Sequence, residues 1–426
     1  MSKHLKKEEF QQAAVQAWIK KGGKGTVEAA TGSGKNFVSF LAIQSIVDPG
    51  DERPILLLAE TTNREDTYFE DLAKYEEIYK VDLKNTHNWE FACYQSAYKW
   101  EGRDYKMVIA DEIHDSLTIK YSEFYFNNNF DKIIGLSATV DRQAKIDSSD
   151  PECITTKGDL LKEIAPVCFT YNMDSARKEG VLPPLNLYVI NHQLDSTKKT
   201  IKGGSQRSGY FMQTEAAAYS YRENKFLSSL RLPENVKKYA IRTAVQARSS
   251  LMYELPSKTE AVKKLVDTIS SKFRTIVFGN SLPELHKICP DSVVASKDSE
   301  NKVQKEETNK EIIRRFQEEE TNLIGSFKKM KQGENLKNLD MVVLHSYYSK
   351  DKDYIQRIGR LRFRDNFIAT AVVFRTQGTV EQKWFKAMTE SLDISNALYF
   401  DGVDHFLQFV KNNNFQITVP QFASVN

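Results

Sequence analysis

Short apolar runs that end in small or acidic residues recur through the first third of the chain, with charged amphipathic segments between them. Five of them stand at 25–30, 54–60, 90–94, 106–112 and 132–138, with the sequences GTVEAA, PILLLAE, EFACY, KMVIADE and KIIGLSA. Apolar runs of strand length that alternate with amphipathic segments are typical of βα units. The pattern therefore predicts a parallel sheet with helices between its strands.

The second half of the chain repeats this pattern after a break. Polar turns and the segment FTYNMDSARKEGVLPP occupy 141–184, which we predict to be a connection between domains. The second series stands at 185–194, 274–280, 291–296, 322–327, 340–346 and 368–375, with the sequences LNLYVINHQL, RTIVFGN, DSVVAS, NLIGSF, DMVVLHS and IATAVVFR. The fold class predicted is therefore two α/β domains in tandem, each on a parallel sheet.

Length and composition agree with two soluble domains. A chain of 426 residues is too long for one compact core. Its net charge of +3, with 40% hydrophobic and 27% charged residues, is typical of a globular protein. The four cysteines form no C-x-x-C pair, which indicates neither a zinc site nor a disulfide framework. Neither an apolar signal segment nor an 18-residue apolar run is present, so we expect a monomeric cytoplasmic protein without membrane contact.

One segment of the second half differs in composition. Residues 197–249 hold eleven lysines and arginines against three glutamates, a net charge of +8, whereas the rest of the chain carries −5. From Glu215 the composition is helical, and KGGSQRSG before it predicts a loop. Near the C-terminus, Val403, Phe406, Leu407 and Val410 have the spacing of an amphipathic helix that packs on the core.

The stretch VEAATGSGKN, residues 27–36, predicts a phosphate-binding loop after a strand, with a glycine turn and an incidental lysine as the alternative. Glycines let the backbone N–H groups of such a loop point at phosphate oxygens, and the lysine adds a cation for the β and γ phosphates. The residue after the lysine is Asn36, where Ser or Thr normally supplies an oxygen to Mg²⁺. An amide oxygen is also an acceptable Mg²⁺ ligand. The residues predicted to bind ATP here are Thr31, Gly32, Ser33, Gly34, Lys35 and Asn36.

Two acids follow the apolar run 107–110 and complete the predicted nucleotide site. Asp111 and Glu112 stand at the carboxyl end of the strand, where open α/β sheets bind ligands. We predict that Asp111 and Asn36 hold Mg²⁺, and that Glu112 orients and deprotonates the attacking water. The alternative, two solvated acids in a turn, is common for an isolated Asp-Glu pair.

The order of these motifs resembles that of superfamily 2 helicases of the DExH type, with DEIH at 111–114. The resemblance runs over nearly the whole chain and implies two RecA-like domains, at 1–165 and 182–426, joined by a linker at 166–181, with a basic helical insertion at 197–249. EEFQQAAVQAW resembles the adenine-reading segment, with Gln11 as the reader, although Glu8 stands where an arginine is common. GLSATV resembles the motif in which Ser137 and Thr139 couple the nucleotide site to the strand-binding face.

The resemblance also assigns residues of the second domain. Motif V is matched at 324–344, with Gly333 and Asn335 at its core, and Asn335 is expected at the nucleotide. YIQRIGRLRFRD resembles motif VI, in which Gln356 senses the γ phosphate and Arg360 and Arg362 supply positive charge to the transition state. Arg362 falls one residue earlier than in the commoner spacing, where Phe363 stands here. A basic surface strip is the alternative interpretation of this stretch.

Nucleic acid is expected to lie across both domains and to be held through its backbone phosphates. The family positions that contact the strand are Thr61, Thr62, Gln95, Ser96 and Ser326, for which helix and turn capping is the alternative role. We further hypothesise that the +8 segment grips duplex or branched DNA through Lys237, Lys238 and Arg242. A solvated helical face would explain the same charges.

The implied activity is ATP hydrolysis, with ATP and Mg²⁺ as cofactors, coupled to movement along nucleic acid. Residues 176–182 resemble the segment by which DNA-directed relatives enter their second domain, and the compact length is similar to that of phage branch-migration helicases. We therefore expect forked or branched DNA as substrate, in replication, recombination or repair. An RNA helicase, and a nucleotide-binding clamp that hydrolyses little because of Asn36, stay open.

Overall fold

The computed structural model describes residues 3–30, 32–138, 140–147, 153–179, 181, 185–206, 209–295, 302–327, 336, 339–347, 368–389 and 394–417. The chain divides into two compact units, Met1–Leu182 and Pro183–Asn426. Each contains one large parallel sheet, which confirms the predicted fold class. None of the helices in the described ranges has the length and apolar character needed to cross a lipid bilayer.

The sheet of the first unit has the strand order β3-β2-β4-β5-β1-β6, and every neighbouring pair is parallel. The five predicted strands are all present. The strands are β1 (Lys24–Ala29), β2 (Ile55–Ala59), β3 (Trp89–Cys93), β4 (Asp104–Asp111), β5 (Asn129–Ser137) and β6 (Val167–Tyr171). The central strands are buried because helices cover both faces of the sheet, as the continuous apolar runs require.

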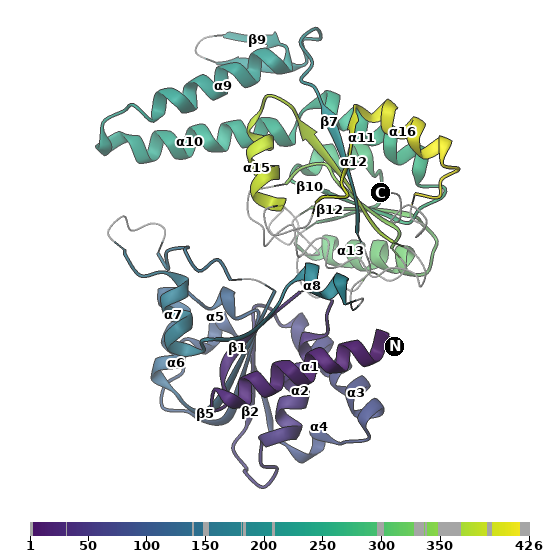
Figure 1. The fold of residues 1–426 in the computed structure, drawn as a ribbon. Coiled ribbons are helices and arrows are strands. Elements are labelled where there is room, and N and C mark those ends of the chain that lie inside the picture. The colour runs from purple at the N-terminus through teal and green to yellow at the C-terminus, as the bar shows by residue number, and fades with distance from the viewer. Residues whose placement is uncertain are drawn as a thin grey trace. The chain divides into compact units, whose positions relative to one another are not determined.

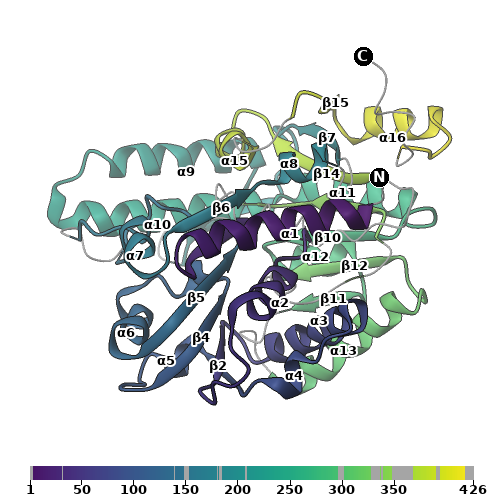
Figure 2. The same cartoon turned by 60° about the horizontal axis from the view of Figure 1, so that its bottom comes forward.

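Helices of the first unit lie in two layers (Figures 1 and 2). On one side are α1 (Lys3–Lys20), α2 (Lys35–Ile46), α3 (Asn63–Tyr79) and α4 (Leu83–Thr86). On the other are α5 (Tyr94–Ala97), α6 (Ile119–Asn127) and α7 (Lys157–Ile164), with the short helix η1 (Ile113–Asp115) after β4. Side chains of α5, α6 and α7 form a core with β2, β4 and β5, which includes Leu58, Val108, Phe124 and Leu161.

The boundary between the units lies later than the predicted linker 166–181. Within that segment β6 pairs with β1 in the first sheet, and α8 (Met173–Lys178) follows it. The strand was missed because VCFTY is half-buried at the sheet edge and mixes apolar with polar residues. Most of the predicted linker is therefore part of the first unit, which continues to Leu182.

The sheet of the second unit has the order β11-β12-β10-β13-β14-β7-β15, again with parallel neighbours. The strands are β7 (Leu185–His192), β10 (Thr275–Gly279), β11 (Val293–Ala295), β12 (Leu323–Phe327), β13 (Met341–Leu344), β14 (Ala369–Thr376) and β15 (Leu398–Asp401). Only β15 was not predicted. Apart from those of the +8 segment, the described helices of this unit are α11 (Pro256–Ile269), α12 (Leu282–Ile288), α13 (Lys302–Gln317), α15 (Val380–Thr389) and α16 (Val403–Asn412).

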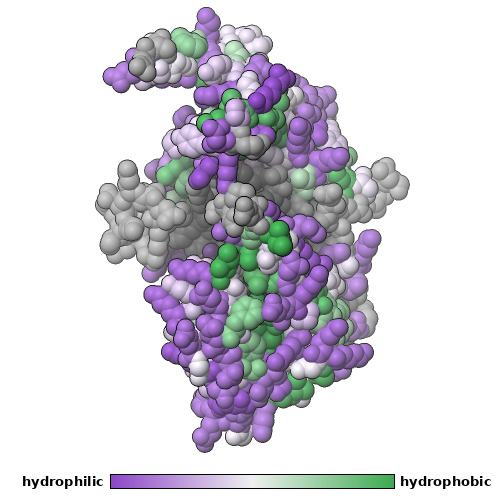
Figure 3. Space-filling model, turned by 90° about the vertical axis from the view of Figure 1, so that its left-hand side faces the viewer, coloured by the Kyte–Doolittle hydropathy of each residue, from purple (hydrophilic) through white to green (hydrophobic). Residues whose placement is uncertain are grey.

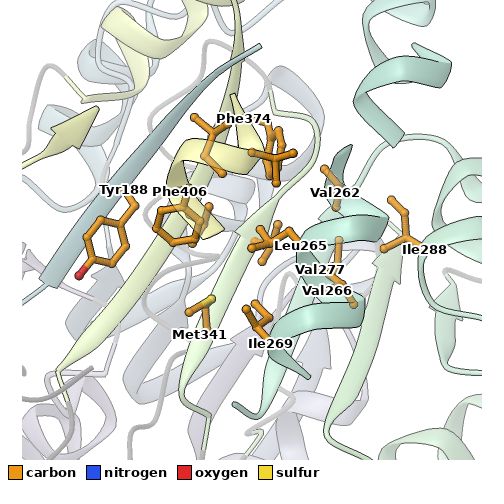
Figure 4. Packing of buried hydrophobic residues seen from close by; sticks show 14 of the residues in the cluster. Tyr188, Val262, Leu265, Val266, Ile269, Val277, Ile288, Met341, Phe374 and Phe406 are labelled. Atoms are coloured by element: carbon orange, nitrogen blue, oxygen red, sulfur yellow. The ribbon is translucent and has the colours of Figure 1, made fainter. Parts of the chain in front are cut away.

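The core of the second unit lies between its sheet and three helices, α11, α12 and α16 (Figure 4). Val262, Leu265, Val266 and Ile269 recur at helical spacing on α11 and are all buried. On α16 the buried residues are Val403, Phe406, Leu407 and Val410, which confirms the predicted C-terminal helix. This packing holds the ends of the parallel strands in fixed positions.

The +8 segment forms an arm and a hairpin. The helices α9 (Glu215–Ser229) and α10 (Glu234–Tyr253) run antiparallel, side by side, and extend from the second unit; we call this pair the arm (Figures 1 and 2). The predicted loop KGGSQRSG is instead part of an antiparallel hairpin of β8 (Ile201–Ser205) and β9 (Gly209–Gln213). Its glycines gave no strand signal, because the ribbon is exposed and needs no apolar alternation. Figure 3 shows hydrophobic residues among mostly hydrophilic ones on the surface.

Candidate nucleotide site

The phosphate-binding loop joins β1 to α2 with two glycines in the left-handed region. Gly32 has φ 84° and Gly34 has φ 97°, a conformation that L side chains rarely adopt. A Cβ at Gly34 would also lie 2.9 Å from Gln11 Nε2. Helix α2 begins directly after the loop, and no side chain caps its first turn. Its backbone N–H groups therefore remain suited to bind phosphate oxygens. Ser33 and Gly34 belong to this loop, and Thr31 lies outside the described residues.

Gln11 reaches the loop from helix α1. Its side chain is buried, and Nε2 donates to the Gly34 carbonyl oxygen at 3.5 Å. The neighbouring Phe10 stacks on Tyr171 of β6, with ring centroids 4.4 Å apart, which fixes this part of α1 on the sheet. A glutamine beside the phosphate loop is compatible with the predicted adenine-reading role, which stays a prediction.

Lys35 and Glu112 form an ion pair at the carboxyl edge of the sheet. Lys35 Nζ lies 3.1 Å from Glu112 Oε1, and 9% and 15% of the two side chains are exposed. Glu112 itself has φ 50°, a left-handed turn that ends β4 and starts η1. Burial alone raises the pKa of this carboxyl, but the charges of Lys35, His114 and Arg64 outweigh that effect and lower the pKa to about 2. Glu112 is therefore ionised over the whole physiological range.

Asp111 lies beside Glu112, and its carboxylate binds Arg64 of α3. Arg64 Nε donates to Asp111 Oδ2 at 2.7 Å, and the Arg64 Nη2 group binds the same oxygen. The other oxygen, Asp111 Oδ1, is buried and accepts no hydrogen bond from the residues described. The backbone at this point is held by Tyr94, whose hydroxyl donates to the Asp111 carbonyl oxygen at 2.9 Å. Within the described part of the chain, Asp111 thus presents one carboxylate oxygen that has no donor.

Asn36 is held by a second carboxylate. Its Nδ2 donates to Asp71 Oδ2 of α3 at 3.0 Å, and Asp71 Oδ1 accepts from Lys74 Nζ at 2.9 Å. The described residues include no group of three or more His, Cys, Asp or Glu side chains that could hold a metal by themselves. A buried carboxylate oxygen and an amide near a phosphate loop nevertheless fit Mg²⁺ that arrives with a nucleotide, because such Mg²⁺ takes few protein ligands. Asp111 and Asn36 are the residues that would hold it.

His114 connects this site to the end of β5. Its Nδ1 lies 2.7 Å from Ser137 Oγ, and both side chains are buried. The His114 carbonyl oxygen accepts from Lys157 Nζ at 2.8 Å. The structure thereby brings together the histidine of the DEIH sequence and the serine predicted to couple hydrolysis to nucleic-acid binding. Thr139, the other predicted coupling residue, lies outside the described residues.

The predicted nucleic-acid contacts of the first unit are on the surface. Thr61, Thr62, Gln95 and Ser96 are all exposed. Thr62 stands at the start of α3, but its side chain makes no capping hydrogen bond, so the alternative capping role is not observed. Ser96 Oγ donates to the Cys93 carbonyl oxygen at 2.9 Å.

The predicted nucleic-acid contacts of the second unit differ in their exposure to solvent. Ser326 lies in β12 with only 1% of its surface exposed. Its position therefore does not support the nucleic-acid contact predicted for it. The apolar strand pattern around it buries both faces. On α10, Lys238 and Arg242 are exposed and Lys237 is half-buried. The remaining predictions, for Gly333, Asn335, Gln356, Arg360 and Arg362, lie outside the described residues.

Sequence reasoning missed three residues of the site. Arg64, Asp71 and Tyr94 each bind a predicted residue, but each lies on a different helix or strand from the residue that it binds. The one signal that points to Arg64 is its place in the first turn of a helix just after a strand, at the same sheet edge as Asp111.

Two family models match the chain. Residues 4–142 match the family model described as "Type III restriction enzyme, res subunit", and residues 257–363 match "Helicase conserved C-terminal domain". No curated protein sequence matches the chain significantly.

Solved structures share the fold at low sequence identity. Dbp5 of S. cerevisiae bound to RNA and ADP BeF3 is 12% identical, with TM-score 0.60, over 95% of this chain and 92% of that one. The type ISP restriction-modification enzyme LlaBIII bound to DNA is 14% identical, with TM-score 0.58, over 95% of this chain and 32% of that one. The Hef helicase domain of Pyrococcus furiosus is 14% identical, with TM-score 0.50, over 88% and 96%.

Proposed function

Because the chain carries, in order, the two conserved domains of a superfamily 2 helicase, we propose that it is an ATP-driven motor of DExH type that moves along DNA and remodels forked or branched substrates. The observation that carries the ATPase part is the arrangement of Lys35, Glu112 and Asp111 at the N-terminus of α2. These groups are what phosphoryl transfer to water requires.

The residues of the first domain have distinct roles in this proposal. The N–H groups at the start of α2 and the Lys35 ammonium bind the nucleotide phosphates. Asp111 and Asn36 hold Mg²⁺, which neutralises phosphate charge when bound. Glu112 accepts a proton from the attacking water through Oε2, which is buried and accepts no hydrogen bond within the described structure. Arg360, Arg362, Gln356 and Asn335 are proposed to complete the site from the second domain.

Coupling of hydrolysis to movement is proposed to pass through His114 and Ser137. Glu112 Oε2 lies 3.4 Å from His114 Nδ1, which in turn contacts Ser137 Oγ. A change of charge at Glu112 during turnover acts directly on this hydrogen bond. Ser137 ends β5, so its displacement alters the loop that follows.

The arm is proposed to bind DNA phosphates. Two of its glutamates are engaged with other residues: Glu215 accepts a hydrogen bond from Ser257 of α11, and Glu223 pairs with Arg248 at 2.6 Å. Exposed cations of the arm include Lys225, Lys238 and Arg242. Tyr221 and Tyr239 are 65% and 77% exposed, and exposed aromatic rings can stack on unpaired bases. Clustered cations beside such rings support binding to a branch point.

The choice of DNA over RNA rests on the first-domain family model, named for a restriction enzyme, and on residues 176–182. In that segment Ala176 and Val181 are buried. The RNA-bound Dbp5 structure keeps an RNA helicase as the second candidate.

The proposal is tested by measuring ATPase stimulation by single-stranded DNA, four-way DNA junctions and duplex RNA in parallel, with Glu112→Gln as the control for contaminating activity. Forked or four-way DNA should stimulate most. Greater stimulation by RNA would identify an RNA helicase, and nucleotide binding without turnover on any substrate would identify a clamp.

A further inference from the structure

The Asn36–Asp71 hydrogen bond bears on which end of the asparagine side chain in the phosphate loop faces a bound cation. An amide has two different ends, and only its oxygen can approach a cation, whereas its NH₂ group carries two donors. A Ser or Thr hydroxyl has no such ambiguity, because one oxygen both donates and accepts. An asparagine at this position therefore needs a partner that decides which end faces the metal.

Asp71 has the chemistry of that partner. An ionised carboxylate only accepts hydrogen bonds, so the end of Asn36 that faces Asp71 Oδ2, 3.0 Å away, is the NH₂ group. Asn36 Oδ1 is then the end that does not face Asp71. The second oxygen of Asp71 accepts from Lys74, which leaves the carboxylate bonded on both sides.

The helices that carry the two residues are held together near the pair. Ser39 Oγ, one turn after Asn36, donates to the Asn36 carbonyl oxygen at 2.7 Å and lies 2.7 Å from the buried Tyr68 hydroxyl of α3. Tyr68 precedes Asp71 by three residues, on the same face of α3. This contact fixes the spacing of α2 and α3 at the level of the Asn36–Asp71 bond.

We propose that Asp71 is a positioning residue that turns the oxygen of Asn36 toward nucleotide-bound Mg²⁺, so that the Asn36–Asp71 pair replaces the usual hydroxyl. The inference rests on the proposed function, because it concerns the same nucleotide site. It names Asp71 as a residue on which metal use by this chain depends, although Asp71 is not itself a ligand.

The test is a double-mutant cycle on the Mg²⁺ dependence of nucleotide binding. A fluorescent ATP analogue is titrated at a series of Mg²⁺ concentrations and in EDTA, with the full chain carrying Asp71→Ala, Asn36→Thr or both. We expect Asp71→Ala to raise the Mg²⁺ concentration for half-maximal binding by about tenfold, the usual effect of removing a hydrogen-bond partner of a metal ligand. Binding in EDTA should not change. In the Asn36→Thr background Asp71→Ala should have no effect, because the hydroxyl needs no partner.

Lys74→Ala is the matched control, because it removes the other partner of Asp71 and leaves Asn36 unchanged. Thermal unfolding of each variant checks that the fold is intact. An unchanged Mg²⁺ dependence in Asp71→Ala overturns the inference, and so does an equal loss in the Asn36→Thr background, since that would indicate a general effect on α3. Failure of the proposed function looks different: the unmodified chain itself would then bind the analogue without any dependence on Mg²⁺.

Discussion

Lys35 Nζ lies 3.1 Å from Glu112 Oε1, so the cation predicted to bind phosphate and the carboxylate predicted to activate water neutralise each other. In the proposed mechanism Lys35 turns to the nucleotide phosphates, and Glu112 would then lose the strongest of the charges that lower its pKa. The carboxylate would become a better proton acceptor when nucleotide is bound, so this contact would couple nucleotide binding to the basicity of Glu112.

Glu112→Gln should keep ATP binding and abolish turnover. The amide preserves the shape of the side chain but cannot accept a proton, and general-base catalysis typically contributes about 10²–10⁴-fold. Lys35→Ala should weaken both binding and turnover, because the proposed mechanism places the Lys35 ammonium on phosphate in both the bound state and the transition state. Equilibrium nucleotide binding and steady-state hydrolysis of the two variants separate these effects. Normal hydrolysis by Glu112→Gln would remove Glu112 from the mechanism.

The ion pair should also appear in the pH dependence of stability. The pKa of Glu112 is lowered from 4.5 to about 2 in the folded protein, so its stabilising contribution is complete above about 4.5 and is lost as the pH falls through 2. At pH 7 we expect the unmodified chain to melt a few degrees above Glu112→Gln. The difference should narrow between pH 5 and pH 3. A difference in melting temperature that stays constant over this range would show that the Lys35–Glu112 pair does not stabilise the folded protein.

Ser137→Ala should uncouple hydrolysis from strand separation. The substitution removes the hydroxyl 2.7 Å from His114 Nδ1 but leaves Lys35, Asp111 and Glu112 in place. We expect the rate of ATP hydrolysis to stay within about threefold of normal. The unwinding yield per ATP should fall by about tenfold or more, which corresponds to a coupling free energy in the usual range. Ser45→Ala, which removes an exposed hydroxyl on α2, is the matched control. An unchanged unwinding yield per ATP in Ser137→Ala would exclude this hydrogen bond from coupling.

Replacing Lys237, Lys238 and Arg242 together by glutamine should weaken DNA binding and flatten its salt dependence. Each lost phosphate contact lowers the slope of log affinity against log salt by about 0.9, so the change should reach up to about 3. A control triple variant at Lys272, Lys386 and Lys411, which are exposed on the second unit outside the arm, removes the same charge. Equal effects of the two variants would mean that net charge, and not the arm, determines affinity.

The sequence predicted those parts of the fold and site that depend on local chemistry. Gly32, Gly34 and Lys35 form their loop because positive φ and a helix start are short-range requirements, and Asp111 and Glu112 follow from an apolar strand. Arg64 and Asp71 could not be found in this way, because their partners lie on other elements and are determined by how α3 packs. For Ser326 the motif predicted a contact with nucleic acid, whereas the packing of the sheet buries the side chain. The hairpin β8–β9 was missed because glycine-rich ribbons lack the apolar alternation that indicates strands.

Displacement of the third strand from a DNA triplex tests most directly whether this chain converts ATP hydrolysis into movement along DNA. With ATP and Mg²⁺ the unmodified chain should release the third strand, and Glu112→Gln should bind the same DNA without releasing it. ATP hydrolysis that proceeds on this DNA while the third strand stays bound would contradict the account, because turnover would then occur without translocation.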